Sequence, residues 1–188
     1  RTGLFSTLRE MGAKIEISNP REQAGEPVAD LIVHSSQLRG ITVPAERVPS
    51  MIDEYPILAV AATAAIGQTR MRGLAELRVK ESNRLAAITD GLTACGANIK
   101  IDGDDLIVNG SPDRIPGGVL IESRMDHRIA MSFLVLGMNS KKPIKIISYK
   151  LLGSFRRFLL VCFKRKLVSF FSKFIFRFNS CSKYYFIF

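Results

Sequence analysis

The stretch LTACGANIKI, at residues 92–101, has a near copy in LREMGAKIEI, at residues 8–17. Two later pairs of segments match in the same order, 105–108 with 30–33 and 118–121 with 40–43, and an Asp before an apolar run follows each copy. An internal repeat of about 75–80 residues indicates stacked structural units that bury their apolar faces on one another.

The repeat units combine helical and extended patterns. Apolar residues three or four apart predict helices near 3–11, 56–66, 82–94 and 129–137. Alternating apolar residues predict strands near 13–17, 30–34, 40–44 and 68–72, and the Pro- and Gly-containing segment 19–27 predicts a loop. This order predicts an α/β fold of repeated βαβαββ units, with one complete unit and parts of two others.

The charge is distributed unevenly along the chain. Residues 1–140 hold 15 Lys and Arg against 17 Asp and Glu, whereas residues 141–188 hold 12 Lys and Arg and no acid. The net charge of +10 therefore belongs to the C-terminal segment. We expect no nucleic-acid partner, because the high overall charge averages two unlike segments.

The cysteines and the start of the sequence suggest a cytoplasmic protein. Cys95, Cys162 and Cys181 lack the spacing of metal ligands, and their odd number argues against a disulfide framework. We therefore expect no metal site and a reducing compartment. The chain starts at Arg1 without an apolar signal or targeting pattern, and we interpret it as a fragment that starts inside a larger protein.

Residues 78–84, RVKESNR, place three cations and one carboxylate directly before the apolar positions of the predicted helix near 82–94. A helix N-terminus carries partial positive charge, so cations there are unfavourable unless an anion binds. A phosphate or carboxylate ligand is one interpretation of this segment. A solvated, charged turn is the other.

The RVKESNR run resembles the signature of the EPSP synthases, the enolpyruvyl transferases that act on shikimate-3-phosphate. MIDEYP at 51–56 and MDHRIAM at 125–131 also resemble family motifs, in the family's order. The resemblance extends from residue 1 to about residue 147. It implies an incomplete inside-out α/β barrel domain, in which three repeat units pack their helices inward and their sheets outward.

The resemblance assigns roles to five residues. Asp53 matches the catalytic aspartate, which binds the sugar-like substrate and accepts the proton of its attacking hydroxyl. Glu81 matches the proton donor to the methylene carbon of phosphoenolpyruvate, and Lys80 matches a contact to shikimate-3-phosphate. Arg84 and Arg128 match arginines that hold phosphoenolpyruvate, where a planar guanidinium can pair with two oxygens at once.

Purely structural roles remain the alternative for several residues in these motifs. Asp53 could be a first-turn or capping carboxylate of the next helix. Asp126 could cap a helix or orient Arg128, and His127 could be a hydrogen-bonded structural histidine. Nothing in the sequence assigns a function to His34.

The reaction implied by the resemblance is addition followed by elimination. The 5-hydroxyl of shikimate-3-phosphate attacks C2 of phosphoenolpyruvate, C3 is protonated, and phosphate leaves to give EPSP. This chemistry, a step of aromatic amino-acid biosynthesis, requires no metal or organic cofactor. The family is monomeric, and its other half-site lies in an N-terminal domain that would precede Arg1.

Residues 148–188 depart from the family pattern. We interpret them as a divergent tail outside the domain, produced by a frameshift or out-of-frame extension with no selected function. Apolar residues between 155 and 174 recur at roughly helical spacing, so an amphipathic helix on an anionic membrane is the alternative. For the whole chain, the alternatives are a UDP-N-acetylglucosamine enolpyruvyl transferase-like fragment and a non-catalytic frameshifted product.

Overall fold

The computed structural model describes residues 2–148, 158–161 and 174–177. Its helices are α1 (Gly3–Glu10), α2 (Val48–Met51), α3 (Tyr55–Thr63), α4 (Arg84–Ala94) and α5 (His127–Asn139), with 3-10 turns η1 (Ala45–Arg47), η2 (Ile52–Glu54) and η3 (Ala75–Val79). Its strands are β1 (Lys14–Gln23), β2 (Glu26–His34), β3 (Thr42–Val43), β4 (Gly67–Met71), β5 (Asn98–Asp102), β6 (Asp105–Gly110), β7 (Leu120–Glu122), β8 (Lys145–Ser148), β9 (Phe158–Val161) and β10 (Phe174–Arg177).

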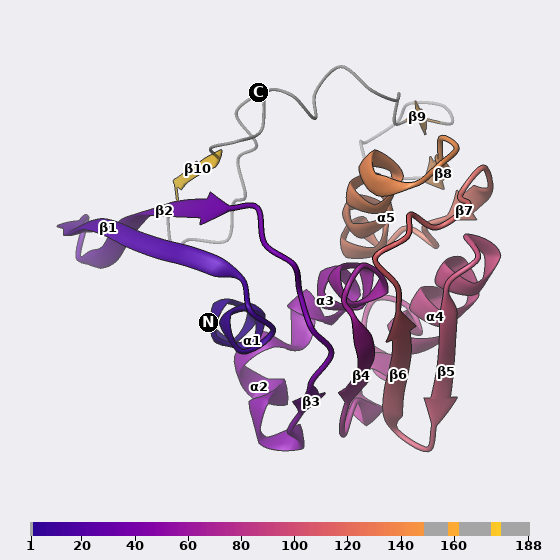
Figure 1. The fold of residues 1–188 in the computed structure, drawn as a ribbon, viewed down its shortest axis with the longest axis horizontal. Coiled ribbons are helices and arrows are strands. Elements are labelled where there is room, and N and C mark those ends of the chain that lie inside the picture. The colour runs from indigo at the N-terminus through magenta and orange to yellow at the C-terminus, as the bar shows by residue number, and fades with distance from the viewer. Residues whose placement is uncertain (1, 149–157, 162–173, 178–188) are drawn as a thin grey trace.

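The described strands form three sheets. The orders are β1-β2-β10, β3-β4-β6-β5 and β7-β8-β9. In the central sheet β3 is parallel to β4, and the other neighbours are antiparallel. The β1–β2 hairpin extends to one side of the molecule, and α3, α4 and α5 lie together beside the central and third sheets (Figure 1).

The predicted internal repeat is visible in the hydrogen bonding. Ala13 N donates to Leu8 O at 2.8 Å after α1, and Ala97 N donates to Leu92 O at 2.9 Å after α4. Each helix is followed by an antiparallel hairpin, β1–β2 or β5–β6. The short parallel pair β3–β4 is matched by the parallel pair β7–β8. The sequence copies therefore correspond to copies of the same local structure.

The predicted loop at 19–27 is wrong. Both strands continue through this segment, and the chain reverses at Ala24 and Gly25, whose φ angles of 54° and 78° suit a two-residue hairpin turn. The register shifts between Ser18 and Arg21. This irregularity accommodates Pro20, which cannot donate to a strand ladder, without ending the strand.

Two further boundaries differ from the sequence prediction. The strand expected at 40–44 is shortened to β3, and a 3-10 turn, η3, separates β4 from α4. The helix expected from residue 82 begins at Arg84, because the Asn83 side chain accepts from Ala86 N at 3.1 Å and caps it. Lys80 and Glu81 therefore precede the helix, as expected, and Ser82 and Asn83 precede it too.

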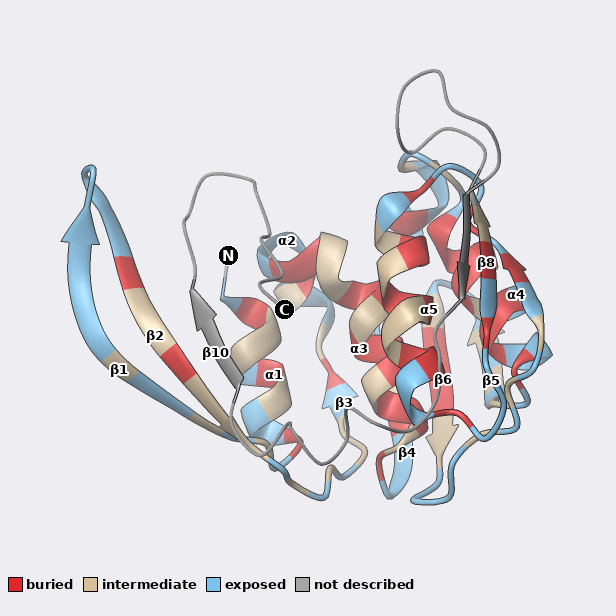
Figure 2. Cartoon of the chain, turned by 90° about the horizontal axis from the view of Figure 1, so that it is seen from above, coloured by how far each residue is buried: buried red, intermediate tan, exposed pale blue. Residues whose placement is uncertain are grey.

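The buried residues concentrate on the helices and on the inner face of the central sheet (Figure 2). Tyr55 and Leu58 of α3, Leu85 and Ile88 of α4 and Phe133 of α5 belong to one apolar cluster. Packing of α3 against both α5 and α4 brings the N-terminal ends of these helices into one region.

Gly91 gives a test of this helix packing. A Cβ at this position would lie 2.3 Å from Phe133 Cζ, so we expect Gly91→Ala to destabilise the protein by about 1–3 kcal/mol through overpacking. At an exposed helix position, replacement of glycine by alanine would instead stabilise the protein. Urea denaturation followed by circular dichroism measures the change. Thr93→Ala, at an exposed position of the same helix, is the control, and an increase in stability for Gly91→Ala would contradict the packing.

Most of the predicted tail helix lies outside the described residues. Its described parts, 158–161 and 174, are in strands β9 and β10, which pair antiparallel with β8 and β2. The boundary placed at residue 147 stays a prediction. Within the parts of the chain that the structure describes, no helix has the length and apolar character needed to cross a bilayer.

Candidate active site

Arg84 is the first residue of α4 and the single buried Lys or Arg in the described part of the chain. Its Nε donates to Asp126 Oδ2 at 2.7 Å, and its Nη1 donates to Asp53 Oδ1 at 2.8 Å. Nη2 lies 2.5 Å from Glu81 Oε2, an ion pair without the alignment of a hydrogen bond. Carboxylates from three separate segments thus surround one guanidinium.

Asp53 and Asp126 hold Arg84 from corresponding places in the repeat. Asp53 lies in η2, directly before α3, and Asp126 directly precedes α5. Asp126 also caps α5, because its Oδ1 accepts from Arg128 N at 2.9 Å and Ile129 N at 3.4 Å. The capping alternative is therefore correct for Asp126, and its side chain also contacts Arg84. The side chain of Asp53 instead pairs with arginines.

A second arginine extends this network. Arg128 Nη2 lies 3.3 Å from Asp53 Oδ2, and its Nη1 lies 3.5 Å from Glu54 Oε1. Asp53 therefore bridges Arg84 and Arg128. Glu54, which the motifs did not assign to the site, joins it through this contact.

The predicted site residues are thus brought together, with one exception. Asp53, Glu81, Arg84 and Arg128 are connected by ion pairs, whereas Lys80 pairs with Glu76. Glu76 lies one helical turn before Lys80, in η3.

Ser82 is a further residue that the motifs did not assign to the site, and its Oγ donates to Asp126 Oδ2 at 3.1 Å. For Asp126, a signal was present in the sequence: Asp53 and Asp126 occupy matching places in the repeat, which indicates that both can contact one partner, here Arg84.

Burial and charge act in opposite directions on the two most enclosed groups. Burial raises the pKa of Asp126, but the Arg84 hydrogen bond and charge and the Arg128 and Ile129 N–H groups outweigh it, so its pKa is lowered. Burial lowers the pKa of Arg84, but Asp126, Asp53 and Glu81 outweigh it, so its pKa is raised. Both groups are therefore held in their charged forms.

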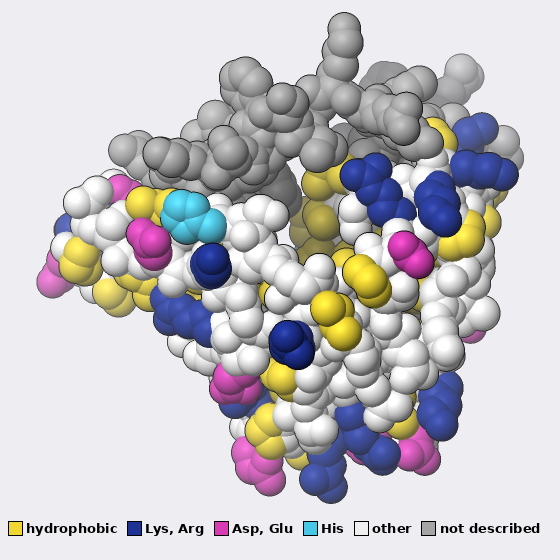
Figure 3. Space-filling view, viewed as in Figure 1, with side chains coloured by type: hydrophobic (Ala, Val, Ile, Leu, Met, Phe, Trp, Pro, Cys, Tyr) yellow, Lys and Arg dark blue, Asp and Glu magenta, His cyan; other side chains and the backbone are white. Residues whose placement is uncertain are grey.

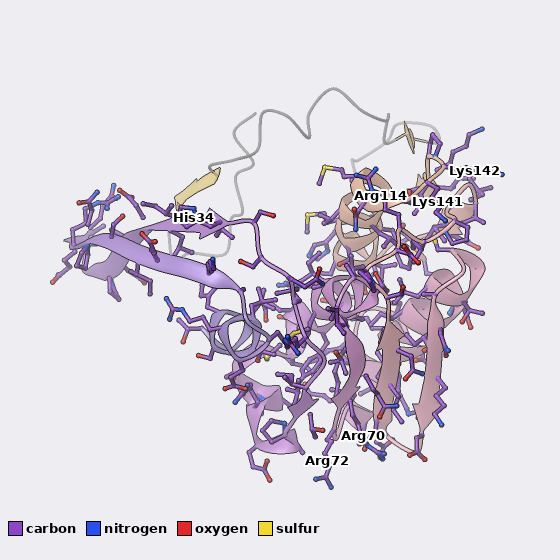
Figure 4. The ribbon with its side chains drawn as sticks, viewed as in Figure 1. His34, Arg70, Arg72, Arg114, Lys141 and Lys142 are labelled. Atoms are coloured by element: carbon purple, nitrogen blue, oxygen red, sulfur yellow. The ribbon has the colours of Figure 1, made fainter. Side chains whose placement is uncertain are left out.

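The surface cations form separate groups. Arg114, Lys141 and Lys142 gather at one end of the molecule, and Arg70 and Arg72 lie at the other (Figure 4). The space-filling view shows Lys and Arg scattered over this face among acidic and apolar side chains (Figure 3). His34, on the hairpin, has Nε2 3.3 Å from Glu16 Oε1. Among the described residues, no three His, Cys, Asp or Glu side chains are grouped to hold a metal ion.

A family model described as EPSP synthase (3-phosphoshikimate 1-carboxyvinyltransferase) matches residues 2–159. The chain belongs to the EPSP synthase family. The family match continues 12 residues beyond the resemblance recognised in the sequence, which ended near residue 147. The assignment from the three motifs is confirmed.

Individual members of the EPSP synthase family agree with this assignment. The chain is 63% identical over 147 residues to the 3-phosphoshikimate 1-carboxyvinyltransferase of Paramagnetospirillum magneticum, covering 78% of this chain and 33% of that protein. It is 62% identical over 146 residues to the enzyme of the same name from Acidiphilium cryptum, covering 78% of this chain and 32% of that protein. The chain thus spans about a third of the length of the curated relatives it matches.

A solved EPSP synthase structure confirms the fold class. The structure of EPSP synthase from Acinetobacter baumannii superimposes with a TM-score of 0.73 at 43% identity, covering 78% of this chain and 34% of that one. The α/β units described above are therefore part of an enolpyruvyl transferase fold. The substrate roles of Asp53, Lys80, Glu81, Arg84 and Arg128 stay predictions.

Proposed function

We propose that this chain supplies one part of the substrate site of an EPSP synthase. The complete enzyme would transfer the enolpyruvyl group of phosphoenolpyruvate to the 5-hydroxyl of shikimate-3-phosphate, giving EPSP and phosphate. One observation carries the proposal: in a chain of this family, the candidate residues Asp53 and Glu81 contact the buried guanidinium of Arg84, and Asp53 joins Arg128 to the same cluster.

In the proposed site, Arg84 and Arg128 hold phosphoenolpyruvate. The Arg84 side chain has no solvent exposure, whereas Glu81 is 56% exposed. Glu81 can therefore move away from Nη2 more readily than the better enclosed Asp53 and Asp126 can leave the other two nitrogens. Departure of Glu81 would open one side of the guanidinium to a substrate oxygen, while the other sides stay fixed.

The two carboxylates have separate tasks in the proposed reaction. Asp53 accepts the proton of the 5-hydroxyl as the oxygen attacks C2, and Glu81 donates a proton to C3. Phosphate then leaves the tetrahedral intermediate with the electrons of its C2–O bond, and C3 returns a proton to the Glu81 carboxylate, so that the C–H electrons restore the C2–C3 double bond. Lys80 binds shikimate-3-phosphate after leaving Glu76. We propose that no metal or organic cofactor takes part.

Among the described residues, the site has more carboxylates than cations, which supports the proposal that another domain of the enzyme completes it. Four carboxylates, Asp53, Glu54, Glu81 and Asp126, lie around the guanidiniums of Arg84 and Arg128. Repulsion from these carboxylates would weaken the binding of the two anionic substrates and leave them incompletely aligned for reaction until further cations approach from another domain. We therefore propose that the 188-residue chain alone has no measurable transferase activity, and that a separate N-terminal domain completes the site.

We propose that the domain ends near residue 147 and that 148–188 is a tail outside it. The described parts of this segment, β9 and β10, are edge strands of their sheets. Buried contacts for the tail's cations would be costly without acidic partners, which residues 141–188 lack. We further propose a monomeric, cytoplasmic enzyme without a nucleic-acid partner.

Deletion of residues 148–188 tests this division. We expect the shortened chain to keep its circular dichroism spectrum and to be at least as soluble, because the apolar cluster is retained. Size-exclusion chromatography and thermal unfolding measure both properties. If the deletion unfolded residues 1–147 while the full chain was a stable monomer, the tail would belong to the domain.

The choice of sugar substrate separates this function from that of the UDP-N-acetylglucosamine enzymes. Ligand-observed NMR on the 188-residue chain, with phosphoenolpyruvate present, should detect shikimate-3-phosphate and not UDP-N-acetylglucosamine. Lys80→Ala should weaken the signal, whereas Lys100→Ala, an exposed strand position, should not. A response to the nucleotide sugar alone, or to neither ligand, would contradict the proposal.

A further inference from the structure

We propose that Asp126 is a positioning residue, which fixes Arg84 and the start of α5 so that the two arginines can act on one anionic substrate. This inference rests on the proposed function and adds a residue to it. Asp126 is fully buried, so it acts through Arg84 and does not touch the substrate itself.

The contacts of Asp126 connect two segments that are distant in sequence. Oδ2 accepts from Arg84 Nε at 2.7 Å and from Ser82 Oγ at 3.1 Å. Oδ1 accepts from the backbone N–H groups of Arg128 and Ile129. A carboxylate offers about four acceptor positions, and here each oxygen receives two donors. The segment before α4 and the N-terminus of α5 are thus joined through one side chain.

The burial of the Asp126–Arg84 ion pair indicates that its role is to fix geometry. Asp126 is the single buried carboxylate among the described residues, and its side chain and that of Arg84 both have no solvent exposure. A buried ion pair contributes little to stability compared with an apolar pair of the same volume, but it fixes geometry. Its position at the centre of the candidate site therefore favours orientation over stability as its role.

The backbone before Asp126 supports the same conclusion. Arg124 and Met125 have φ angles of 52° and 62°, a left-handed conformation that is unfavourable for residues other than glycine. Arg124 Nη2 donates to Asp90 Oδ2 of α4 at 3.0 Å, and Asp126 N donates to Ser123 O at 2.9 Å. The turn is thus tied to α4 in a strained form that directs Asp126 to Arg84.

Asp126→Asn separates positioning from helix capping. Asparagine caps a helix about as well as aspartate and has the same shape, but it removes the charge that faces Arg84. In the full 188-residue chain we expect the helical circular dichroism signal to be kept. Exchange of the Arg84 Nε proton with solvent, measured by NMR, should become at least about tenfold faster, and the dissociation constant of phosphoenolpyruvate should rise about tenfold.

The pH profile gives a second readout. Because its pKa is lowered, Asp126 contributes stability above its unfolded pKa of about 3.9 that is lost as the pH falls through its folded pKa. Asp126→Asn should remove this part of the acid dependence. Asp102→Asn, which disrupts the exposed pair with Arg70 at 2.9 Å away from the site, is the matched control and should change neither proton exchange nor phosphoenolpyruvate binding.

The outcomes distinguish this inference from the proposed function. Unchanged Arg84 proton exchange in Asp126→Asn would overturn the positioning role. Faster Arg84 proton exchange with an unchanged dissociation constant for phosphoenolpyruvate would show that Asp126 has a structural role alone. This result would also overturn the positioning role. A third outcome is that the native chain does not bind phosphoenolpyruvate, while Asp126→Asn still speeds exchange of the Arg84 Nε proton. That result would overturn the proposed function and support the positioning of Arg84 by Asp126.

Discussion

Replacement of Arg84 by alanine is expected to lower the free energy of unfolding by about 3–5 kcal/mol. The substitution leaves Asp126 buried and Asp53 largely enclosed without the guanidinium that balances them. A loss of this size corresponds to a decrease in Tm of roughly 10 °C in a protein of this length. Thermal unfolding at pH 7, followed by circular dichroism, measures it.

Arg124→Ala provides the control for Arg84→Ala. Arg124 also pairs with an aspartate across two elements, but its side chain is 45% exposed and that of Asp90 is 64% exposed. Exposed pairs contribute about 0–1 kcal/mol, so its Tm should change little. Equal effects of the two substitutions would show that Arg84 is an ordinary surface charge.

The second large effect concerns Glu81 and Asp53 in a complete enzyme. Residues 2–147 can replace the matching segment of the Paramagnetospirillum magneticum relative, with which this chain shares 63% identity. In this chimera, Glu81→Gln should lower kcat by about 10²–10⁴ because the proton donor is lost. The KM for phosphoenolpyruvate should change less, since Asp53 and Asp126 still hold Arg84.

Asp53→Asn should behave differently from Glu81→Gln. It removes the proton acceptor and also the charge shared by Arg84 and Arg128, so we expect kcat to fall and the KM for phosphoenolpyruvate to rise. Steady-state kinetics with both substrates measures the difference. Asp102→Asn, at an exposed pair with Arg70, is the control, and a normal kcat for either site variant would remove that residue from the mechanism.

The sequence predicted those features that depend on local pattern. Apolar spacing located α1, α3, α4 and α5, and the copies at 8–17 and 92–101 predicted repeated units. The continuous β1–β2 hairpin was missed, because Pro20 and Gly25 usually interrupt strands. The bulge that accommodates Pro20 and the tight turn that contains Gly25 both depend on cross-strand pairing.

The candidate site was predicted as a set of residues and not as a network. The motifs identified Asp53, Glu81, Arg84 and Arg128, but they could not show which carboxylate would face which arginine. Those partners depend on the packing of α3, α4 and α5, which lies beyond local pattern. The pairing of Lys80 with Glu76 and the double role of Asp126 follow from the same three-dimensional contacts.

The most direct test of the central claim is the turnover of the unmutated chimera with phosphoenolpyruvate and shikimate-3-phosphate. Release of phosphate and formation of EPSP should proceed with a kcat/KM within about tenfold of the parent relative, a difference of about 1.4 kcal/mol. A folded chimera that releases no phosphate, although the parent relative is active under the same conditions, would contradict the claim that this chain carries a competent part of an EPSP synthase site.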